Sequence, residues 1–233
     1  AGKECYLPSR TFFRTHAIGF FRTYRSCLEQ AGFDGLLIRA FEEIQWMREE
    51  QISLSASFDA SVYAWNHGAV HTLKEEQAAF ITAPWELNSR ELEPVFEACR
   101  REGLPAELIV YGRAPMMVSA QCITKTVKGC SKCPSLLWMK DRTGARLPVQ
   151  NHCAFCYNTI LNPLPVSLHG CADSVKRLAP EGLRLCFTIE TGEETKAVLN
   201  AFAAEFIRGE NAEPPFTEFT RGHFRLGSRI GYG

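Results

Sequence analysis

The chain has 233 residues, of which 45% are hydrophobic and 22% are charged, the ordinary composition of a globular protein with a substantial core. Its 26 Lys and Arg residues balance its 26 Asp and Glu residues, so the net charge alone indicates no class of partner. No apolar run approaches the roughly 18 residues of a membrane span, and the N-terminal residues lack the pattern of a signal peptide. These features predict a cytoplasmic protein without a membrane partner.

The first half of the chain alternates short apolar runs with amphipathic patterns of helical period. Gly32 is a suitable end for the first helix, and Asn88 with Glu91 has the spacing of a capping box. Strands are expected at 35–40, 52–57, 78–83 and 106–112, and helices at 15–32, 41–50, 60–71 and 88–103. This alternation predicts an α/β fold made of parallel βα units, as in an α/β barrel or an open doubly wound sheet.

The alternation ends at Gly112. Two β-like runs flank the turn sequence "DRTG" between 136 and 150, which predicts an antiparallel hairpin. An apolar run at 183–190 is expected to form a further strand, and the amphipathic segment 192–209 a helix. The second half of the chain is therefore expected to place a hairpin module before a final strand and helix.

Five of the ten cysteines are concentrated in one short segment. Cys130 and Cys133 have the spacing CxxC, and Cys153 and Cys156 repeat it after nineteen intervening residues. Two such pairs on a hairpin are typical of a four-thiolate metal site, because a tetrahedral ion receives its ligands from two directions. Four thiolates bind either zinc or an iron–sulfur cluster, so the spacing leaves the metal open. Cys122, just ahead of the two pairs, is a fifth thiol that a closed zinc site does not need.

Several motifs along the chain resemble those of one known family. They are "FDASVYAWNHGAV", "PWELNSREL", "YGRAPMMVSAQC", "KDRTGARLPV", "HCAFCYN", "LNPLPVSL", "LRLCFTIET" and "FTRGHF". Together they resemble peptidase family U32, the collagenase-like peptidases, and within it the branch related to the ribosomal RNA cytidine hydroxylase. The resemblance implies a TIM-type barrel, a 4Fe–4S cluster on four cysteines, and oxygen-independent hydroxylation of RNA or of ubiquinone precursors. It also implies that the RNA branch requires prephenate as a metabolite.

The resemblance also selects a set of ligands. The cysteine that ends "MVSAQC" is Cys122, the next along is Cys130, and the pair before "YN" is Cys153 and Cys156. The family pattern thus implies that these four cysteines hold a 4Fe–4S cluster and that Cys133 is an extra thiol. Spacing alone instead favours the two CxxC pairs, with Cys133 as a ligand and zinc as the alternative metal.

The beginning of the chain departs from the family pattern, because the first barrel strands and a stretch of cysteines and glycines are absent. The resemblance therefore predicts the second half of a TIM-type barrel, with the other half missing or supplied by a partner chain. We predict three regions, namely a βα-repeat region or partial barrel at 1–112, a cysteine-rich metal or cluster module at 113–170, and a final strand and helix with the C-terminal tail at 171–233.

Candidate catalytic and binding residues follow the predicted strands. Asp59 and Glu86 come shortly after two of them, at the strand ends where barrel active sites are built. For each carboxylate the alternative role is to cap the helix that follows. Arg113, just past another strand, is a candidate for binding a carboxylate or a phosphate, with a surface ion pair as its alternative role.

Peptidase motifs are weak in this sequence. His67 and His71 stand at i and i+4, but Gly68 occupies the position where zinc peptidases keep their glutamate. A structural role is therefore expected for both histidines. No GxSxG sequence is present either.

Basic residues surround the cysteines. From Arg113 to His152 the chain has seven Lys and Arg residues and one acid, Asp141. Lys125 and Lys128 lie between Cys122 and Cys130, so they join Arg113 as candidate residues for binding an anion. Candidates for stacking on bases are Trp65, Trp85, Trp138 and Tyr157, although most aromatic residues at such positions belong to cores.

Three functional hypotheses follow. The first is an iron–sulfur protein of the U32 family that hydroxylates RNA, with RNA and a carboxylated metabolite such as prephenate as partners. The second is a collagenase-like peptidase. The third is a zinc-stabilised, non-enzymatic module of a larger assembly.

Overall fold

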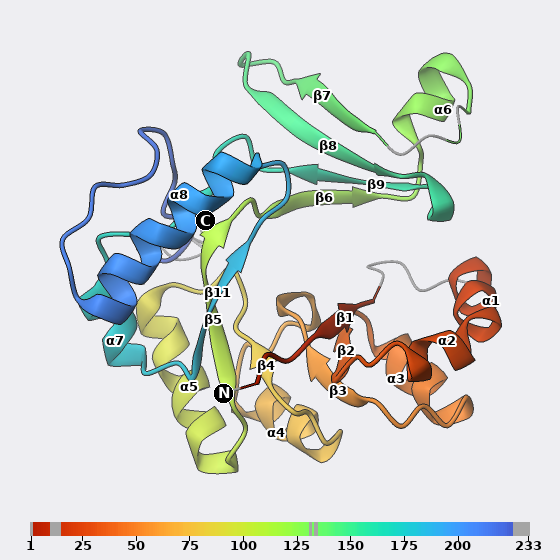
Figure 1. Ribbon diagram of the computed structural model, residues 1–233, viewed down its shortest axis with the longest axis horizontal. Coiled ribbons are helices and arrows are strands. Elements are labelled where there is room, and N and C mark those ends of the chain that lie inside the picture. Colours follow the sequence, from red (N-terminus) through yellow and green to blue (C-terminus); the bar gives the residue numbers. More distant parts are fainter. Residues whose placement is uncertain (1, 10–14, 131, 133–134, 226–233) are drawn as a thin grey trace, which may run out of the picture. The chain divides into compact units, whose positions relative to one another are not determined.

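The computed structural model describes residues 2–9, 15–130, 132 and 135–225 (Figure 1). Two compact units can be distinguished. One comprises the chain up to Leu108 together with Leu178–Leu183, and the other comprises Ile109–Arg177 and Arg184–Arg225. Within the described ranges, no helix combines the length and the apolar character that a membrane crossing requires.

The first unit is built on parallel strands with helices between them. The strands pair in their chain order, β1 with β2, β2 with β3, β3 with β4 and β4 with β5. Their bounds are Tyr6–Pro8 for β1, Gly35–Ile38 for β2, Ser55–Phe58 for β3, Ile81–Thr82 for β4 and Ala106–Gly112 for β5. Consecutive parallel pairing of this kind is the arrangement of βα units in part of a TIM-type barrel. The predicted α/β class is confirmed.

The connecting helices begin and end at residues that suit helix termini. In α5, Asn88 and Glu91 form the predicted capping box, and Gly103 follows in a left-handed conformation with φ of 60°. The helix predicted over 15–32 is divided at Tyr24 but ends before Gly32, as expected. The helix bounds are Thr15–Thr23 for α1, Arg25–Gln30 for α2, Phe41–Glu49 for α3, His67–Glu75 for α4 and Ser89–Glu102 for α5.

The helix predicted at 60–71 is wrong. A short 3-10 turn, η1, spans Ala60–Val62 and ends at Tyr63, whose φ of 56° is left-handed. The helix α4 begins only at His67, because the Asn66 side chain accepts a hydrogen bond from the Ala69 N–H at 3.0 Å. Two separate caps, at Asp59 and Asn66, therefore divide one expected helix into a turn and a helix.

The two faces of the parallel sheet differ in polarity. Ile38, Phe58 and Ile81 are neighbours in the strand register and are fully buried. Burying each such side chain stabilises the fold by about 1.5–3 kcal/mol. Because side chains alternate along a strand, Ser57 and Thr82 belong to the opposite face, where both are also buried. This second face therefore carries hydroxyl groups that need partners.

The second unit contains an antiparallel sheet in the order β6-β9-β8-β7. The predicted hairpin is present as β7 and β8. Its turn is closed by the Asp141 carboxylate, which accepts hydrogen bonds from the Thr143 N–H and hydroxyl and from the Ala145 N–H. The bounds are Pro115–Ser119 for β6, Ile123–Lys128 for α6, Leu136–Lys140 for β7, Arg146–His152 for β8 and Tyr157–Leu161 for β9.

The chain then completes the second unit with two short strands and two helices. The last residues of β5 pair antiparallel with β10, and β11 also pairs with β5. The strand predicted at 183–190 stops at Cys186, and Glu190 then accepts hydrogen bonds from the Thr188 and Ile189 N–H groups. The bounds are Val166–Ser167 for β10, Ala172–Leu178 for α7, Gly182–Cys186 for β11 and Gly192–Phe202 for α8, which continues as a π-helix, η3, over Ala203–Arg208.

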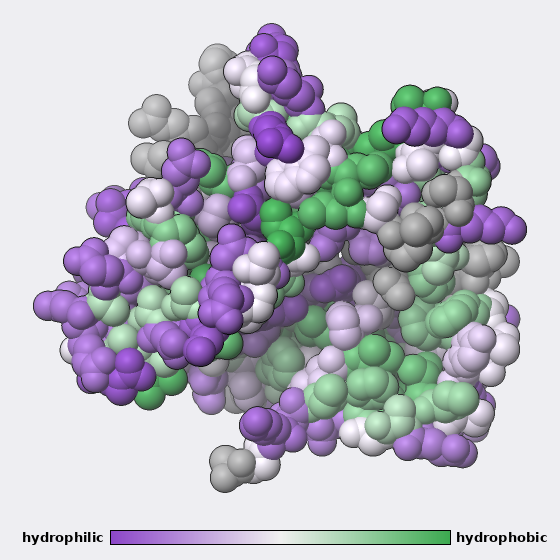
Figure 2. Space-filling view, turned by 45° about the horizontal axis from the view of Figure 1, so that its top comes forward, coloured by the Kyte–Doolittle hydropathy of each residue, from purple (hydrophilic) through white to green (hydrophobic). Residues whose placement is uncertain are grey.

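The surface is mixed in polarity. Figure 2 shows hydrophilic side chains over much of the face in view, with apolar side chains gathered between them. In the second unit the two outer strands of the antiparallel sheet expose large apolar side chains, whereas Val149 of β8 and Leu161 of β9 are buried. The exposed ones are Met116 and Met117 of β6 and Leu136, Trp138 and Met139 of β7.

Candidate functional site

Three of the predicted cysteine ligands lie at one end of the antiparallel sheet. Ser119, the last residue of β6, pairs with Asn158 near the start of β9, and the last residue of β8 pairs with the first residue of β9. Cys122 follows β6 by three residues, and Cys153 and Cys156 lie in the connection from β8 to β9. The strand register therefore brings all three to the same end, where α6 also lies (Figure 1).

The segment that carries Cys130 leads toward this end as well. The Asn151 N–H donates to the carbonyl oxygen of Ser135 at 3.1 Å, and β7 begins one residue later, opposite Gln150. Cys130 lies five residues before Ser135 on this path and is exposed. Cys133, the alternative ligand, falls outside the described residues.

Two buried asparagine side chains fasten the Cys122 segment to the strands. The Asn158 amide, which is fully buried, donates to the carbonyl oxygen of Gln121 at 2.7 Å. The Asn151 amide donates to the Thr124 hydroxyl at 3.2 Å, and its oxygen lies 3.7 Å from Cys122 Sγ. Buried amides need such partners, so these contacts fix the position of Cys122 against β8 and β9.

The connection between β8 and β9 is a tight turn. Cys153–Phe155 form a 3-10 turn, η2, and Cys156 adopts a left-handed conformation with φ of 53°. The Cys156 nitrogen and Sγ lie 3.4 and 3.8 Å from the carbonyl oxygen of Cys153. Compact CxxC turns of this kind present two thiolates to one metal.

The donor set suits a four-thiolate metal site, either zinc or a 4Fe–4S cluster, because soft sulfur ligands select both. The Lys125 N–H lies 3.5 Å from Cys122 Sγ, and hydrogen bonds of this type tune thiolate ligands. In the part of the chain that the structure describes, no three His, Cys, Asp or Glu side chains are grouped closely enough to hold a metal ion. The strand register nevertheless brings the segments that carry Cys122, Cys153 and Cys156 to one end of the sheet.

Exposed cations lie at both ends of the antiparallel sheet. Lys125 and Lys128 of α6 are at the cysteine-bearing end, whereas Lys140, Arg142 and Arg146 flank the β7–β8 turn at the opposite end. Within the described ranges, none of these five forms an ion pair with a carboxylate. The Arg146 guanidinium lies 4.9 Å from the centre of the Trp138 ring, which is 47% exposed. Cations beside an exposed aromatic ring are typical of surfaces that bind single-stranded nucleic acid.

Arg113, the other predicted anion-binding residue, is engaged by the chain itself. Its Nη1 donates to the carbonyl oxygens of Asn162, at 3.2 Å, and of Pro163. Its Nε lies 3.9 Å from the Glu190 carboxylate, which also accepts the Tyr111 hydroxyl proton at 2.9 Å. Burial, reinforced by Glu190, raises the pKa of Tyr111 well above its usual value. The structure thus places Arg113 inside a polar cluster of the second unit, and its role in anion binding stays a prediction.

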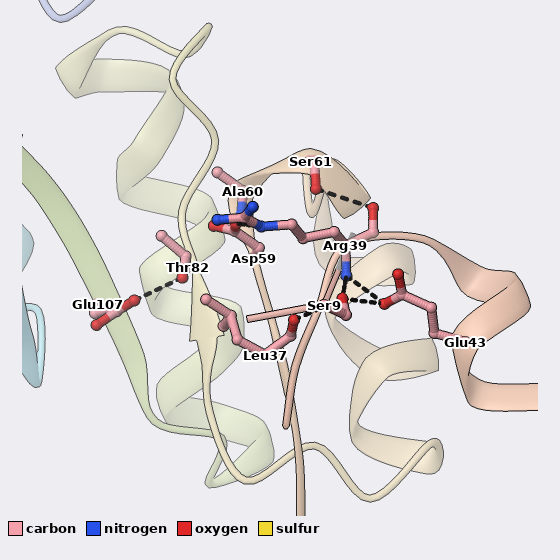
Figure 3. A network of polar contacts seen from close by, with 9 residues as sticks. All are labelled: Ser9, Leu37, Arg39, Glu43, Asp59, Ala60, Ser61, Thr82 and Glu107. Atoms are coloured by element: carbon pink, nitrogen blue, oxygen red, sulfur yellow. Dashed lines mark hydrogen bonds and ion pairs between the residues drawn. The ribbon is translucent and has the colours of Figure 1, made fainter. Parts of the chain in front are cut away.

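A second polar cluster lies at the carboxyl ends of the first three parallel strands (Figure 3). Ser9 follows β1, Arg39 follows β2 and Asp59 follows β3. Arg39 Nε donates to Asp59 Oδ2 at 2.7 Å, and the Ser61 hydroxyl donates to the Arg39 carbonyl oxygen at 3.0 Å. Asp59 Oδ1 accepts from the Ala60 N–H at 2.9 Å. Asp59 therefore lies at a strand end, as predicted, and also caps the turn that follows, which was its alternative role.

Glu43 of α3 joins this cluster from a buried position, with 1% of its surface exposed. Its Oε2 lies 2.5 Å from the Ser9 hydroxyl and accepts the Arg39 N–H at 2.8 Å. Burial raises the pKa of Glu43 to about 7, although the hydrogen bonds from Ser9 and Arg39 oppose this shift. A protonated Glu43 can donate to Ser9, which then donates to the Leu37 carbonyl oxygen at 2.8 Å.

The remaining predicted residues lie elsewhere in the first unit. Glu86 is half-buried four residues after β4. His71 of α4 lies 3.3 Å from Glu102 and 3.6 Å from Glu75, contacts that agree with the structural role expected for it.

Sequence reasoning missed Ser9, Arg39 and Glu43, although two of them carry a signal. Arg39 comes directly after the apolar run of β2, at a position equivalent to that of Asp59 after β3. Glu43 lies on the same side of α3 as Trp46 and Met47, three and four residues on, and all three are buried. An acid on the apolar face of a helix indicates a buried polar contact.

Comparisons with known proteins give one family. The model of peptidase family U32 matches residues 1–162, which include the parallel strands and all five clustered cysteines. No curated protein sequence matches the chain. A crystal structure of a chitinase from Chromobacterium violaceum ATCC 12472 is 9% identical and covers 88% of this chain and 98% of its own, with a TM-score of 0.28. A likeness this weak carries no argument.

Proposed function

Since the chain belongs to peptidase family U32, we propose that it is an iron–sulfur protein that takes part in oxygen-independent hydroxylation of RNA. One observation carries the proposal. Cys122, Cys153 and Cys156, with the segment that bears Cys130, converge at one end of the antiparallel sheet. Four thiolates are the usual ligand set of a 4Fe–4S cluster.

In this proposal Cys122, Cys130, Cys153 and Cys156 hold the cluster, and Cys133 is an additional thiol. When bound, the cluster supplies one-electron transfer. The chain contributes the placement of its ligands. Asn158 holds the segment before Cys122 to β9, and the Lys125 N–H contacts the Cys122 sulfur.

The proposed RNA partner is supported by the charges at the same sheet end. Lys125 and Lys128 are exposed on the helix that begins at Cys122. Cations that no carboxylate neutralises attract phosphate groups, and their counterions are released on binding. The same cations are candidates for a carboxylated metabolite such as prephenate.

Anaerobic purification followed by an absorption spectrum and by iron, sulfide and zinc analysis tests the proposal. We expect a brown protein with about four iron atoms per chain. Cys122→Ala should lose the iron, whereas Cys133→Ala should keep it. One zinc and no iron, lost with Cys133→Ala instead, would establish the zinc-stabilised module and end the redox proposal.

Function can be separated from cluster binding by two further measurements. Deleting the gene should abolish one RNA modification, which the wild-type gene restores and the Cys122→Ala gene does not. Gelatin incubated with the pure protein should stay intact. Hydrolysis of gelatin that survives in Cys122→Ala would replace the proposal with the peptidase alternative.

RNA binding itself should depend on salt through the α6 cations. Lys125→Gln and Lys128→Gln are each expected to reduce the slope of log affinity against log salt by about one, as for loss of one phosphate contact. Fluorescence anisotropy with a labelled single-stranded RNA measures the slope. Lys196→Gln on α8 serves as a control, and an equal change in that variant would contradict a local contact.

A further inference from the structure

We propose that Arg39, held by Asp59 at the carboxyl ends of β2 and β3, anchors a binding subsite for a small carboxylate ligand. Carboxyl ends of parallel strands are where barrel proteins bind their ligands. The subsite belongs to the first unit, so the proposal rests neither on the cysteines nor on an RNA partner.

The guanidinium group of Arg39 is only partly used within the protein. Its Nε donates to Asp59 Oδ2 at 2.7 Å. Its two terminal nitrogens make no hydrogen bond or ion pair with any other residue that the structure describes. The Arg39 side chain is 31% exposed, whereas that of Asp59 is 12% exposed. The buried Asp59 carboxylate thus holds the Nε side of the guanidinium, and the N–H groups of Nη1 and Nη2 are available to bind a ligand.

The position of Arg39 is also fixed through its main chain. Its N–H donates to Glu43 Oε2 at 2.8 Å and lies 3.2 Å from the Ser9 hydroxyl oxygen, and its carbonyl oxygen accepts from Ser61 at 3.0 Å. Four neighbours from three segments therefore hold one arginine (Figure 3). A receptor that is already ordered binds with less loss of entropy than a mobile side chain.

The geometry of the free fork favours a carboxylate. The planar guanidinium pairs with two oxygens through parallel hydrogen bonds, a pattern that carboxylates match. Arg39 and Asp59 cancel in charge, and a protonated Glu43 adds none. An approaching carboxylate therefore gains two charge-assisted hydrogen bonds without meeting a net negative site.

Chemical protection of Arg39 in the unmodified chain tests the subsite directly. Phenylglyoxal reacts with accessible arginine side chains, and peptide mass spectrometry follows each one. Succinate at saturation should slow the modification of Arg39 about fivefold or more and leave Arg48 unaffected, because Arg48 pairs with Glu76 on the helix surface. Succinamide, which has the same skeleton without charge, should give no protection. Equal protection by both compounds, or none by succinate, would overturn the proposal.

A matched pair of variants provides the second readout. Arg39→Lys keeps the charge but removes the fork, so the dissociation constant for succinate in calorimetry should rise about tenfold or more. Arg48→Lys should bind succinate as the wild type does. Unchanged affinity in a folded Arg39→Lys would contradict the subsite. If that variant does not fold, the protection experiment on the unmodified chain decides.

Discussion

At the carboxyl ends of β1, β2 and β3, the rim of the parallel sheet, polar groups bind one another: Asp59 binds the guanidinium of Arg39, while Ser9 and Glu43 accept from its main-chain N–H. At the cysteine-bearing end of the antiparallel sheet, by contrast, Cys130 and Cys156 are exposed, and Lys125 and Lys128 of α6 have no carboxylate partner among the described residues. The polar groups of the rim are mostly satisfied by one another, whereas the thiols and cations of the sheet end would gain their main contacts only from a bound metal or anion. Stability should therefore be intrinsic in the first region and dependent on a ligand in the second.

Removal of the proposed metal should separate the two regions most strongly. We expect anaerobic chelation to reduce amide-hydrogen protection in β8 and β9 about a hundredfold or more, because metal-binding energy becomes folding energy. Protection in β2 and β3 should stay unchanged. Hydrogen exchange read by mass spectrometry measures both regions in one sample. Equal losses in the two would contradict the contrast.

The buried Glu43 of the rim should make the free energy of unfolding depend on pH. The folded-state pKa of Glu43 is raised from 4.5 to about 7, so the folded protein holds this proton more tightly than the unfolded chain. The stabilisation is fully present below pH 4.5 and is lost as the pH rises through 7. It amounts to at most about 3 kcal/mol. Urea unfolding at pH 5 and pH 8 should show this loss in the wild type, and Glu43→Gln, which is neutral at every pH, should lack it.

The exposed neighbour Glu42 provides the control for this measurement. Glu42→Gln should retain the pH dependence of the wild type, because its carboxylate is solvated. If Glu43→Gln and Glu42→Gln behave alike, the buried proton is not the source of the dependence.

A smaller effect is expected where the cysteine segment is fastened to the sheet. Asn158→Ala removes a fully buried amide and its hydrogen bond to Gln121, and should cost about 2 kcal/mol of unfolding free energy. Iron retention should also fall, because the Cys122 turn loses its tie to β9. Thermal unfolding and iron analysis measure the two effects. Asn162→Ala serves as the control, because Asn162 follows β9 directly and takes no part in this contact. It should leave the unfolding temperature and the iron content unchanged.

The smallest effect should come from a helix end that belongs to neither region. Asn88 caps α5 by accepting hydrogen bonds from the Arg90 and Glu91 N–H groups. Asn88→Ala should cost about 1 kcal/mol by chemical denaturation. Its iron content should match the wild type, and a loss of iron would show that α5 is coupled to the cysteine-bearing end of the sheet.

The parts of the fold that local sequence controls could be predicted. The strand β5 lies where its apolar run does, and the Asn88 cap follows from residue type and spacing. The helix expected at 60–71 failed because the cap at Asn66 is as strong a start signal as the one at Asp59. Periodicity does not reveal which of two caps begins a helix.

The sites could be predicted only in their residue types. Cys122, Cys153 and Cys156 were recognisable as thiol ligands, but their shared position depends on β6 pairing with β9, which no local pattern specifies. In the same way, Asp59 was expected at a strand end, while its partner Arg39 lies twenty residues earlier and is joined to it only by the parallel pairing of β2 and β3.

The turn of the β7–β8 hairpin has one further consequence. Asp141, the one acid between Arg113 and His152, accepts hydrogen bonds from Thr143 and Ala145, and these bonds, the Thr143 hydroxyl first, lower its pKa. The Asp141 carboxylate therefore makes its hydrogen bonds within its own turn rather than with the neighbouring cations. A long polyanion that diffuses toward the hairpin is steered by Lys140, Arg142 and Arg146, so its capture should be fast at low ionic strength and slow steeply as salt is added.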